Sequence, residues 1–259
     1  MMDKTIGFIG GGRITRIMLE GFKRKGLAFK KVLVSDINLE ALKLLKGKFP
    51  DVTTTENNTP VAASSDIVFM ALHPPAMLPA LDGIKSSLKQ EAVVISLAPK
   101  ITIAKISKAL VEFSRIVRMI PNAPSLVNKG FNPLVFGERI SRLERDELLS
   151  LLSVLGECPV VKEETLEAYA VLAAMGPTYF WFQWEELENL AAAFGLEREA
   201  ARKALSATIG GAAQTYFHSG LTGGEVMDLI PVKPLKDDEE DIRSRYRLRL
   251  GPLYDKIKP

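Results

Sequence analysis

A glycine-rich turn near the start of the chain carries the clearest chemical signal. Gly10 and Gly12 follow a short apolar run and open a stretch with helical spacing. In such a turn Gly10 permits a tight bend, and Gly12 lets a pyrophosphate approach the positive end of a helix. The third position of this motif, normally glycine or alanine, is Thr15, whose branched side chain must find room against the sheet. The turn predicts dinucleotide binding, with Arg13 and Ile14 beside the phosphates.

An acidic residue, Asp36, follows the second expected strand, 21 residues after Thr15. From this position a carboxylate can accept hydrogen bonds from a ribose 2′-hydroxyl and repel a 2′-phosphate. The same carboxylate can cap the following helix, and both roles stay open. As a cofactor contact, Asp36 slightly favours NADH over NADPH.

Other chemistry is poorly supplied. His73, His218 and the single cysteine, Cys158, form no ligand cluster, so we expect no metal site. The 34 basic and 31 acidic residues are interleaved, without the basic run and stacking aromatics of a nucleic-acid binder. No apolar run approaches the roughly 20 residues that span a bilayer, and no secretory signal opens the sequence. With one cysteine, the composition favours a cytoplasmic protein without membrane or nucleic-acid partners.

The elements that must position the turn can be read from apolar runs. Continuous apolar runs that alternate with helical stretches predict a parallel sheet covered on both faces, and right-handed crossovers make it doubly wound. The expected strands are 5–9, 31–34, 66–72, 92–97, 115–119 and 133–136, and a helix is expected over 39–48.

The pattern changes in the second half of the chain. From about Glu163 to Phe217 the sequence is helical in spacing and rich in alanine and leucine. We therefore expect an α/β protein with a Rossmann-type domain over 1–161 and an all-helical domain over 162–259. Near the end, the acidic run 237–241 precedes arginines at alternate positions 243–249. We interpret this tail as a solvated helix with its charges matched to the dipole, rather than a phosphate or partner site.

Five collinear motifs between residues 5 and 228 resemble those of the pyrroline-5-carboxylate reductases, enzymes of proline biosynthesis that reduce a cyclic imine with a nicotinamide cofactor. The motifs are Gly7-Phe8-Ile9-Gly10-Gly11-Gly12, Ala71-Leu72-His73-Pro74, Arg118-Met119-Ile120-Pro121-Asn122-Ala123-Pro124, Met175-Gly176-Pro177-Thr178-Tyr179 and Gly211-Ala212-Ala213.

The resemblance implies a role for residues at each strand end. Ser35, Asp36 and Asn58 would line the adenosine end of NAD(P)H, and two further segments would line the path to the nicotinamide. These segments contribute Ala71, His73, Pro74 and Ala98. The helical domain would interlace with its twin in a homodimer, so that each active site lies between one Rossmann domain and the paired helical domains.

The resemblance also suggests residues near the substrate. Met175, Gly176 and Pro177 would begin the helix that faces the nicotinamide. Thr178 and Tyr179 offer hydroxyls there and Glu185 offers a carboxylate, although helix packing and interface contacts explain these three equally well. The aromatic residues that follow are most simply a core or dimer-interface stripe: Phe180, Trp181, Phe182 and Trp184.

The chain departs from the family at three places. Ile37 stands where members often carry an arginine for the NADP phosphate, and His73 replaces a lysine. The serine-, glycine- and threonine-rich loop that holds the substrate carboxylate is replaced after Asp228, together with the helix that should follow it. Lys233 or Lys236 could hold an anion there instead, or be simply solvated.

Three functions follow from these observations. The first is an NAD(P)H-dependent reductase that acts on the C=N bond of a cyclic imine or on an altered related substrate. The second is an NAD(P)-binding protein without turnover, which the replaced loop favours. A β-hydroxyacid dehydrogenase is the third, and the absence of a lysine between Gly176 and Glu188 counts against it.

Overall fold

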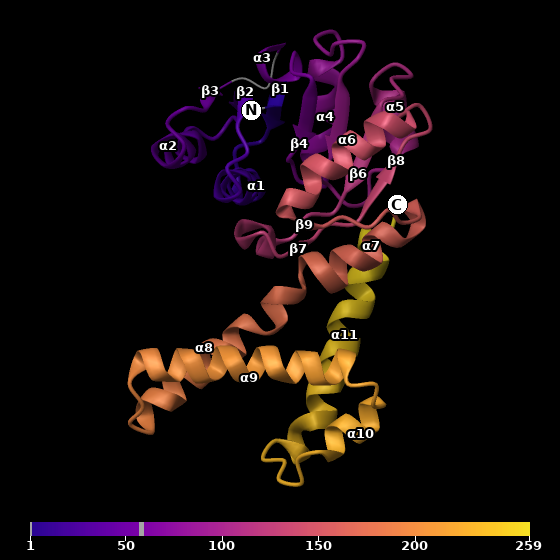
Figure 1. Cartoon of the computed structure of the whole chain (residues 1–259). Helices are drawn as coiled ribbons and strands as arrows, with labels where there is room; N and C mark the ends of the chain where they lie inside the picture. Colours follow the sequence, from indigo (N-terminus) through magenta and orange to yellow (C-terminus); the bar gives the residue numbers. More distant parts are fainter. Residues whose placement is uncertain (1, 57–59) are drawn as a thin grey trace. The chain divides into compact units, whose positions relative to one another are not determined.

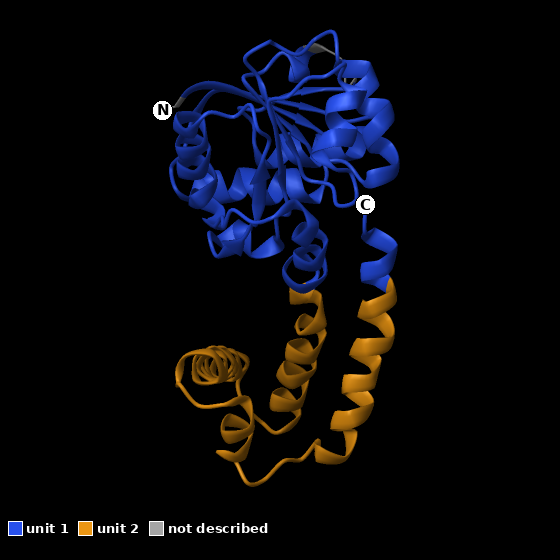
Figure 2. Cartoon of the chain, turned by 90° about the vertical axis from the view of Figure 1, so that its right-hand side faces the viewer, with its two compact units in different colours: residues 1–175, 253–259 blue, residues 176–252 orange. Residues whose placement is uncertain are grey.

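The computed structural model describes residues 2–56 and 60–259, which form two compact units (Figure 2). Unit 1 comprises Met1–Met175 and Leu253–Pro259, and unit 2 comprises Gly176–Pro252. The division lies later than the boundary predicted at residue 162. Leu166 and Ala170 pack against Ile120 in a small apolar cluster that also includes Ile257, so the first helical turns and the last residues belong to unit 1.

Unit 1 is built on a seven-stranded sheet in the order β3-β2-β1-β4-β5-β6-β8 (Figure 1). The strands are β1 (Met2–Ile9), β2 (Phe29–Ser35), β3 (Thr53–Thr55), β4 (Ile67–Met70), β5 (Val93–Ser96), β6 (Ile116–Met119) and β8 (Leu134–Phe136). The doubly wound sheet predicted from the sequence is confirmed, because the chain order reverses between β1 and β4. A short second sheet pairs β7 (Gly130–Phe131) with β9 (Gly156–Glu157).

The last strand of the main sheet departs from the prediction of a parallel sheet. Strand β8 runs antiparallel to β6, with Val117 opposite Phe136. The connection between them holds only a 3₁₀ turn (Ala123–Val127) and β7, not a crossover helix. Parallel neighbours are usually joined by a crossover helix, and this connection contains none.

Helices cover both faces of the sheet in unit 1 (Figure 2). They are α1 (Arg13–Arg24), α2 (Leu39–Lys48), α3 (Pro60–Ala63), α4 (Pro74–Ile84), α5 (Ile103–Ala109), α6 (Arg142–Leu152) and α7 (Leu166–Tyr169). Alternate strand residues point to the two faces. On β4, Ile67 and Phe69 join a core cluster with α1, α2 and α6, whereas Val68 and Met70 join a second cluster with α4 and α5. The predicted helix 39–48 is confirmed as α2.

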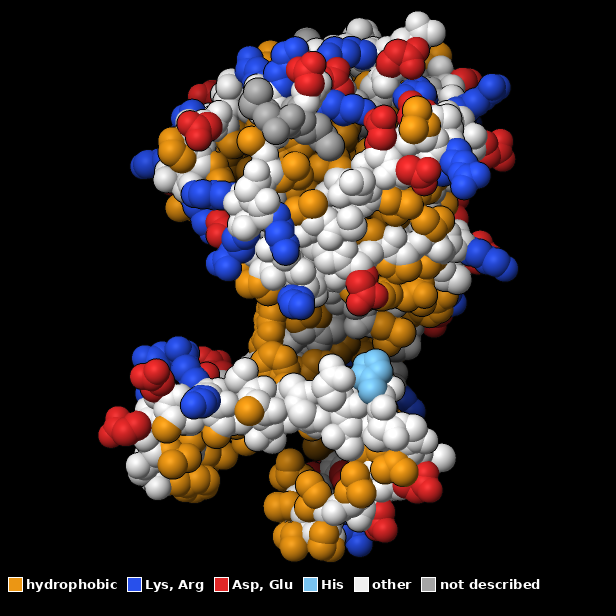
Figure 3. Space-filling model, viewed as in Figure 1, with side chains coloured by type: hydrophobic (Ala, Val, Ile, Leu, Met, Phe, Trp, Pro, Cys, Tyr) orange, Lys and Arg blue, Asp and Glu red, His pale blue; other side chains and the backbone are white. Residues whose placement is uncertain are grey.

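Unit 2 is helical but has almost no interior. Its helices are α8 (Trp181–Ala193), α9 (Arg198–His218), α10 (Gly223–Asp228) and most of α11 (Glu239–Ile257). Every residue of this unit is described, and only Gly176, Ala191 and Ala201 are buried. Large apolar side chains lie on its surface, including Phe194 at 77% and Phe217 at 72% exposure. Figure 3 shows such side chains over the turn between α8 and α9 and around α10.

The charged tail forms a helix. Helix α11 begins with Glu239, Glu240 and Asp241, which suits the positive end of its dipole. The helix predicted for the charged tail is therefore confirmed, and it follows the segment that replaces the family's loop. Pro231–Pro234 lies outside any helix, as predicted from its two prolines. No helix in the described residues has the length and apolar character to cross a bilayer.

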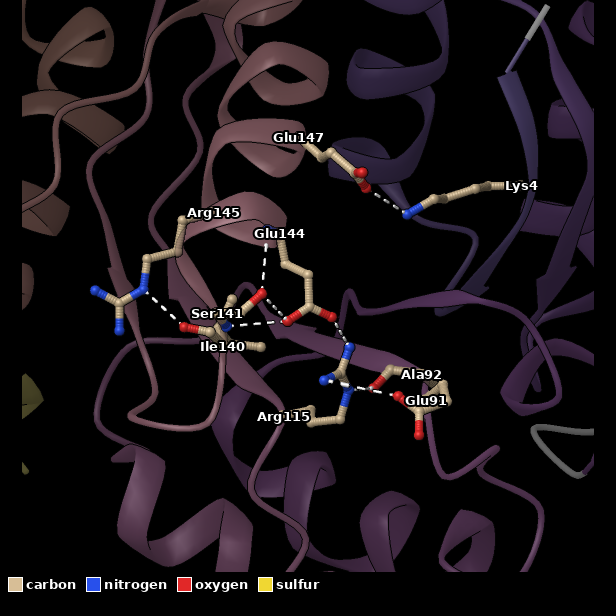
Figure 4. A network of polar contacts seen from close by, with 9 residues as sticks. All are labelled: Lys4, Glu91, Ala92, Arg115, Ile140, Ser141, Glu144, Arg145 and Glu147. Atoms are coloured by element: carbon tan, nitrogen blue, oxygen red, sulfur yellow. Dashed lines mark hydrogen bonds and ion pairs between the residues drawn. The ribbon is translucent and has the colours of Figure 1, made fainter.

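A network of charged side chains fastens the amino edge of the sheet, where the strands begin (Figure 4). Arg115, just before β6, binds Glu144 on α6 and donates to the carbonyl of Ala92 at 3.3 Å. Hydrogen bonds from Arg115 and Ser141 lower the pKa of Glu144 to about 2. At the same edge, burial acts to raise the pKa of Asp66, but hydrogen bonds from Lys89 and Thr5 outweigh it and hold that pKa at about 2.

These two carboxylates predict a stability loss in acid. In the folded protein the pKa values of Asp66 and Glu144 lie below the ordinary values near 4. Their contribution to the free energy of unfolding is therefore complete above about pH 5 and disappears as the pH falls toward 2. After allowance for solvent screening, we expect each to contribute on the order of 1 kcal/mol. Urea unfolding at pH 7, 4 and 3 measures the loss. An Asp66→Asn/Glu144→Gln variant should lose less over this range, and equal losses would contradict the assignment.

Candidate functional site

The turn between β1 and α1 is held tightly against its neighbours. The N–H of Gly10 donates to the carbonyl of Ser35 at 2.7 Å, and Gly10 has φ of +106°, which favours glycine. A Cβ at Gly10 would lie 2.4 Å from the carbonyl oxygen of Ala71, just after β4. No other residue fits there, so glycine is required both by conformation and by space.

Thr15 fits the third motif position through a hydrogen bond. Its hydroxyl donates to the carbonyl of Gly10 at 2.6 Å, and the side chain is fully buried. The hydroxyl therefore ties the first turn of α1 to the glycine turn, which a glycine or alanine at this position cannot do. The crowding expected from a β-branched side chain is resolved in this way.

Asp36 organises the same turn from the end of β2. Its Oδ2 accepts the N–H of Gly11 at 2.6 Å, and its Oδ1 accepts the N–H of Asn38 at 2.8 Å. Asn38 in turn caps α2 by accepting the N–H of Ala41. The carboxylate is half-buried and each oxygen keeps further acceptor capacity. Asp36 therefore holds the glycine turn and the loop before α2, but Asn38 and not Asp36 caps that helix, so the predicted capping role is wrong. The contact between Asp36 and a ribose stays a prediction.

The start of α1 fits a bound pyrophosphate. Among the described residues, no side chain caps this helix, and its first turn holds no acidic residue. A Cβ at Gly12 would have nothing within 4 Å, so the space beside the free N–H groups is open. Arg13 is exposed at the first helical position and Ile14 is half-buried. These donors and this space match what the phosphates of a dinucleotide need.

The carboxyl edge of the sheet brings most predicted cofactor residues together. The N–H of Ala71 donates to Ile9 at 2.8 Å, which places the end of β4 beside the turn. His73 is exposed at the start of α4, and Pro74 is the first residue of that helix. Asn58 lies outside the described residues.

Two predicted contacts need correction. The side chain of Ser35 is fully buried with no hydrogen-bond partner for its hydroxyl among the described residues, so it acts through its backbone carbonyl and not by lining the adenosine end. Ala98 is 2% exposed and lies beneath the edge rather than on it. The apolar runs in the sequence predicted where the strands end. They did not predict which side chains at the strand ends, such as those of Ser35 and Ala98, are buried in the core.

The candidate substrate residues divide between the units. Met175 ends unit 1, and Gly176 and Pro177 open a 3₁₀ turn (Gly176–Tyr179) in unit 2. Thr178 and Glu185 line one cavity of unit 2, of about 780 Å³, which contains the Arg202–Glu188 ion pair at 3.1 Å.

A second cavity of unit 2, of about 720 Å³, lies between α8 and α11. Thr178 and Tyr179 line it together with Arg245 and Arg249. These arginines were read from the sequence as part of a solvated face, because spacing alone does not tell which side of a helix meets a neighbour. Burial raises the pKa of Tyr179, and Tyr246 raises it further, so the phenol stays protonated at neutral pH.

Lys233 and Lys236 are exposed and line none of the cavities described above. Cys158 is half-buried, and burial raises the pKa of its thiol to about 11, so it is not a reactive thiolate. In the described residues, no three His, Cys, Asp or Glu side chains gather as a metal site would require.

The doubly wound sheet, its switch point and the open glycine turn define a dinucleotide-binding protein of the Rossmann class. Residues 5–100, which run from within β1 to just after β5, match the family described as NADP oxidoreductase coenzyme F420-dependent. Pyrroline-5-carboxylate reductases of Methanosarcina acetivorans and Escherichia coli are each 26% identical to this chain. The alignment with the Methanosarcina acetivorans enzyme covers 89% of this chain and 85% of that enzyme. The alignment with the Escherichia coli enzyme covers 88% of this chain and 85% of that enzyme.

Solved structures extend the similarity over the whole chain. A pyrroline-5-carboxylate reductase from Coxiella burnetii is 28% identical with a TM-score of 0.69, covering 99% of this chain and 95% of its own. The pyrroline carboxylate reductase of Plasmodium falciparum, solved with NADP bound, shares the fold with a TM-score of 0.83 and 21% identity. That comparison covers 100% of this chain and 98% of the Plasmodium chain. These relatives confirm the resemblance to the pyrroline-5-carboxylate reductases that the motifs predicted.

The open space beside Gly12 gives a direct test of the nucleotide site. We expect Gly12→Ala to fold normally, because its Cβ meets nothing, but to weaken NADH binding at least about tenfold by filling the approach to the helix N–H groups. Gly47→Ala is the matched control, since a Cβ at Gly47 on α2 is equally unobstructed. Fluorescence titration with NADH measures both, and equal affinities for the two variants would contradict this site.

Proposed function

We propose that this protein is an NAD(P)H-dependent reductase that acts on the C=N bond of pyrroline-5-carboxylate or a closely related cyclic imine. The observation that carries the proposal is the similarity to pyrroline-5-carboxylate reductases across 88–89% of the chain, which includes both units. The open amino end of α1 supports it, because the cofactor of such a reaction needs that anion site.

Each part of the chain has a share in this reaction. The nicotinamide supplies the hydride when the cofactor is bound. Backbone N–H groups of α1 hold the phosphates, and Asp36 holds the turn and meets the adenosine ribose. Thr178 and Tyr179 offer hydroxyl groups near the substrate, and the raised pKa of Tyr179 makes it a hydrogen-bond donor rather than a base. An imine already protonated in solution needs no stronger acid from the protein.

Cofactor preference and the substrate anchor belong to the same proposal. Asp36 is joined by Ile37, which is 86% exposed and offers no positive charge to a 2′-phosphate, so NADH is favoured over NADPH. The substrate carboxylate is met by Lys233 or Lys236 in place of the family's loop. The cytoplasmic location expected from the single cysteine stays a prediction.

An NAD(P)-binding protein without turnover is the second candidate. The segment that replaces the carboxylate loop is apolar and exposed, with Ile230 at 68% and Val232 at 74% exposure. Such a segment suits a protein interface better than a carboxylate site.

Turnover distinguishes these two functions. We expect purified protein to oxidise NADH, and NADPH more slowly, when pyrroline-5-carboxylate is added, as followed by the loss of nicotinamide absorbance. Cofactor binding without oxidation would reject reduction of this substrate and favour the non-catalytic function.

The same assay locates the carboxylate anchor. Lys233→Ala or Lys236→Ala should raise the KM for the imine with little change in the KM for NADH. Lys203→Ala, an exposed lysine on α9, is the control and should leave both unchanged.

We propose that unit 2 pairs with a second copy of the chain. Its helices bury only three small residues of their own and expose aromatic and aliphatic side chains that a monomer would leave in water. The exposed Phe180, Trp181 and Phe182 favour the interface role of the aromatic stripe over a place in this chain's core. Pairing would also bring a second helical unit to each active site, as the resemblance implies.

Light scattering tests this pairing. We expect a particle of twice the 28.5 kDa mass of one chain, and Phe217→Glu should convert it to monomers because the new charge is desolvated at the interface. Lys203→Glu on the same helix serves as the charge-changing control and should remain paired. A monomeric unaltered protein would reject the proposal.

A further inference from the structure

Arg118 is a charged side chain in the middle of the core. It lies on β6, is 0% exposed, and is the largest fully buried side chain among the described residues. Its guanidinium group binds Oε1 of Glu163 at 2.9 Å and Oε1 of Glu167 at 2.5 Å. Removing the charges of Arg118 and Glu167 from water opposes folding, and apolar side chains of similar volume often stabilise such a place as well or better. A contribution to folding stability therefore does not account for these buried charges.

Both carboxylates also bind backbone N–H groups after β5. Oε1 of Glu167 accepts the N–H of Lys100 at 2.8 Å, and Oε1 of Glu163 accepts the N–H of Ile103 at 2.7 Å. Lys100 has φ of +74°, a left-handed conformation that is unfavourable for a lysine. The buried cluster thus holds the segment Leu97–Thr102 in a shape that its own residues do not favour.

The held segment and the holding residues both lead to the proposed active site. Leu97–Thr102 leaves the carboxyl edge of the sheet at β5, beside the end of β4. Glu163 and Glu167 begin the stretch that ends at Met175, and a π-helical turn (Ala170–Ala174) completes it. Asn122, four residues after Arg118, donates to the carbonyl of Ala173 at 3.4 Å. All of these contacts lie within unit 1.

We infer that Arg118, Glu163 and Glu167 form a positioning cluster for the nicotinamide half of the cofactor. The cluster touches neither cofactor nor substrate. It fixes the loop after β5 relative to the stretch that leads to Met175, so that the nicotinamide has one place to lie. This inference rests on the proposed function.

Glu167→Asp tests the cluster because it keeps the charge but withdraws the carboxylate by one methylene from Lys100 and Arg118. We expect the Kd and the KM for NADH to rise about tenfold or more, with a smaller change in kcat. Glu167→Gln keeps an oxygen for the N–H of Lys100, so it should restore part of the affinity. The Kd is measured by NADH fluorescence and does not depend on turnover.

The matched control is a second Arg–Glu pair, whose arginine directly precedes the first residue of β6. Arg115 pairs with Glu144 at the amino edge of the sheet (Figure 4), whereas the proposed cofactor site lies at the carboxyl edge. Glu144→Asp makes the same chemical change in another Arg–Glu pair. It should lower the unfolding midpoint and leave the Kd for NADH unchanged.

The outcomes separate this inference from the function on which it rests. If the unaltered protein fails to bind NADH and NADPH, the proposed function is rejected and the cluster's role with it. If the protein binds and Glu167→Asp alters only stability, as Glu144→Asp does, the inference alone is rejected. Should Glu167→Asp fail to fold, Glu163→Asp replaces it, because Glu163 is partly exposed and reaches the same loop through Ile103. An unchanged Kd in that folded variant rejects the inference.

Discussion

The backbone of the first turn lies so close to the end of β4 that a single methyl group at Gly10 would overlap the carbonyl of Ala71. This contact sets the start of α1 against the place where the strand order reverses, and it leaves the helix N–H groups facing open space. Thr15 and Asp36 hold the same turn from α1 and β2. Helix α1, strand β2 and the end of β4 therefore all contact the backbone of this turn. Their close packing leaves the N–H groups at the start of α1 available to bind an anion.

The sequence predicted much of unit 1 because its signals are local. Continuous apolar runs marked the strands of the main sheet except β3, which consists of three threonines. The glycine turn marked the switch point, and α2 was predicted with its observed bounds. What it missed depends on neighbours distant in sequence. The antiparallel direction of β8 goes with a connection after β6 that has no crossover helix. The extension of unit 1 to Met175 follows from contacts of Leu166 with Ile120. Arg118 stood within a recognised motif, yet only the structure shows that it is buried between two glutamates.

In unit 2 the helices were predictable from composition and spacing, but the surface that covers their apolar side chains was not. So little of the unit is buried that the helices do not cover these side chains themselves. Periodicity tells that a helix has an apolar side without telling which surface covers it. The arginines of α11 illustrate the same point, since two of the four line a cavity while Arg243 and Arg247 pair with glutamates of their own helix.

Unit 1 is discontinuous in sequence, and this affects the order in which it can fold on the ribosome. Its third apolar cluster includes Ile257, which is translated only after the whole of unit 2. The large clusters around the sheet, and the packing of Ile120 against Leu166, can form while synthesis continues, but the contact with Ile257 must wait. During that interval the helix that leads out of unit 1 lacks one of its apolar contacts. Translation thus imposes a sequence of assembly in which the nucleotide-binding sheet forms early and the anchoring of the exit helix is completed last.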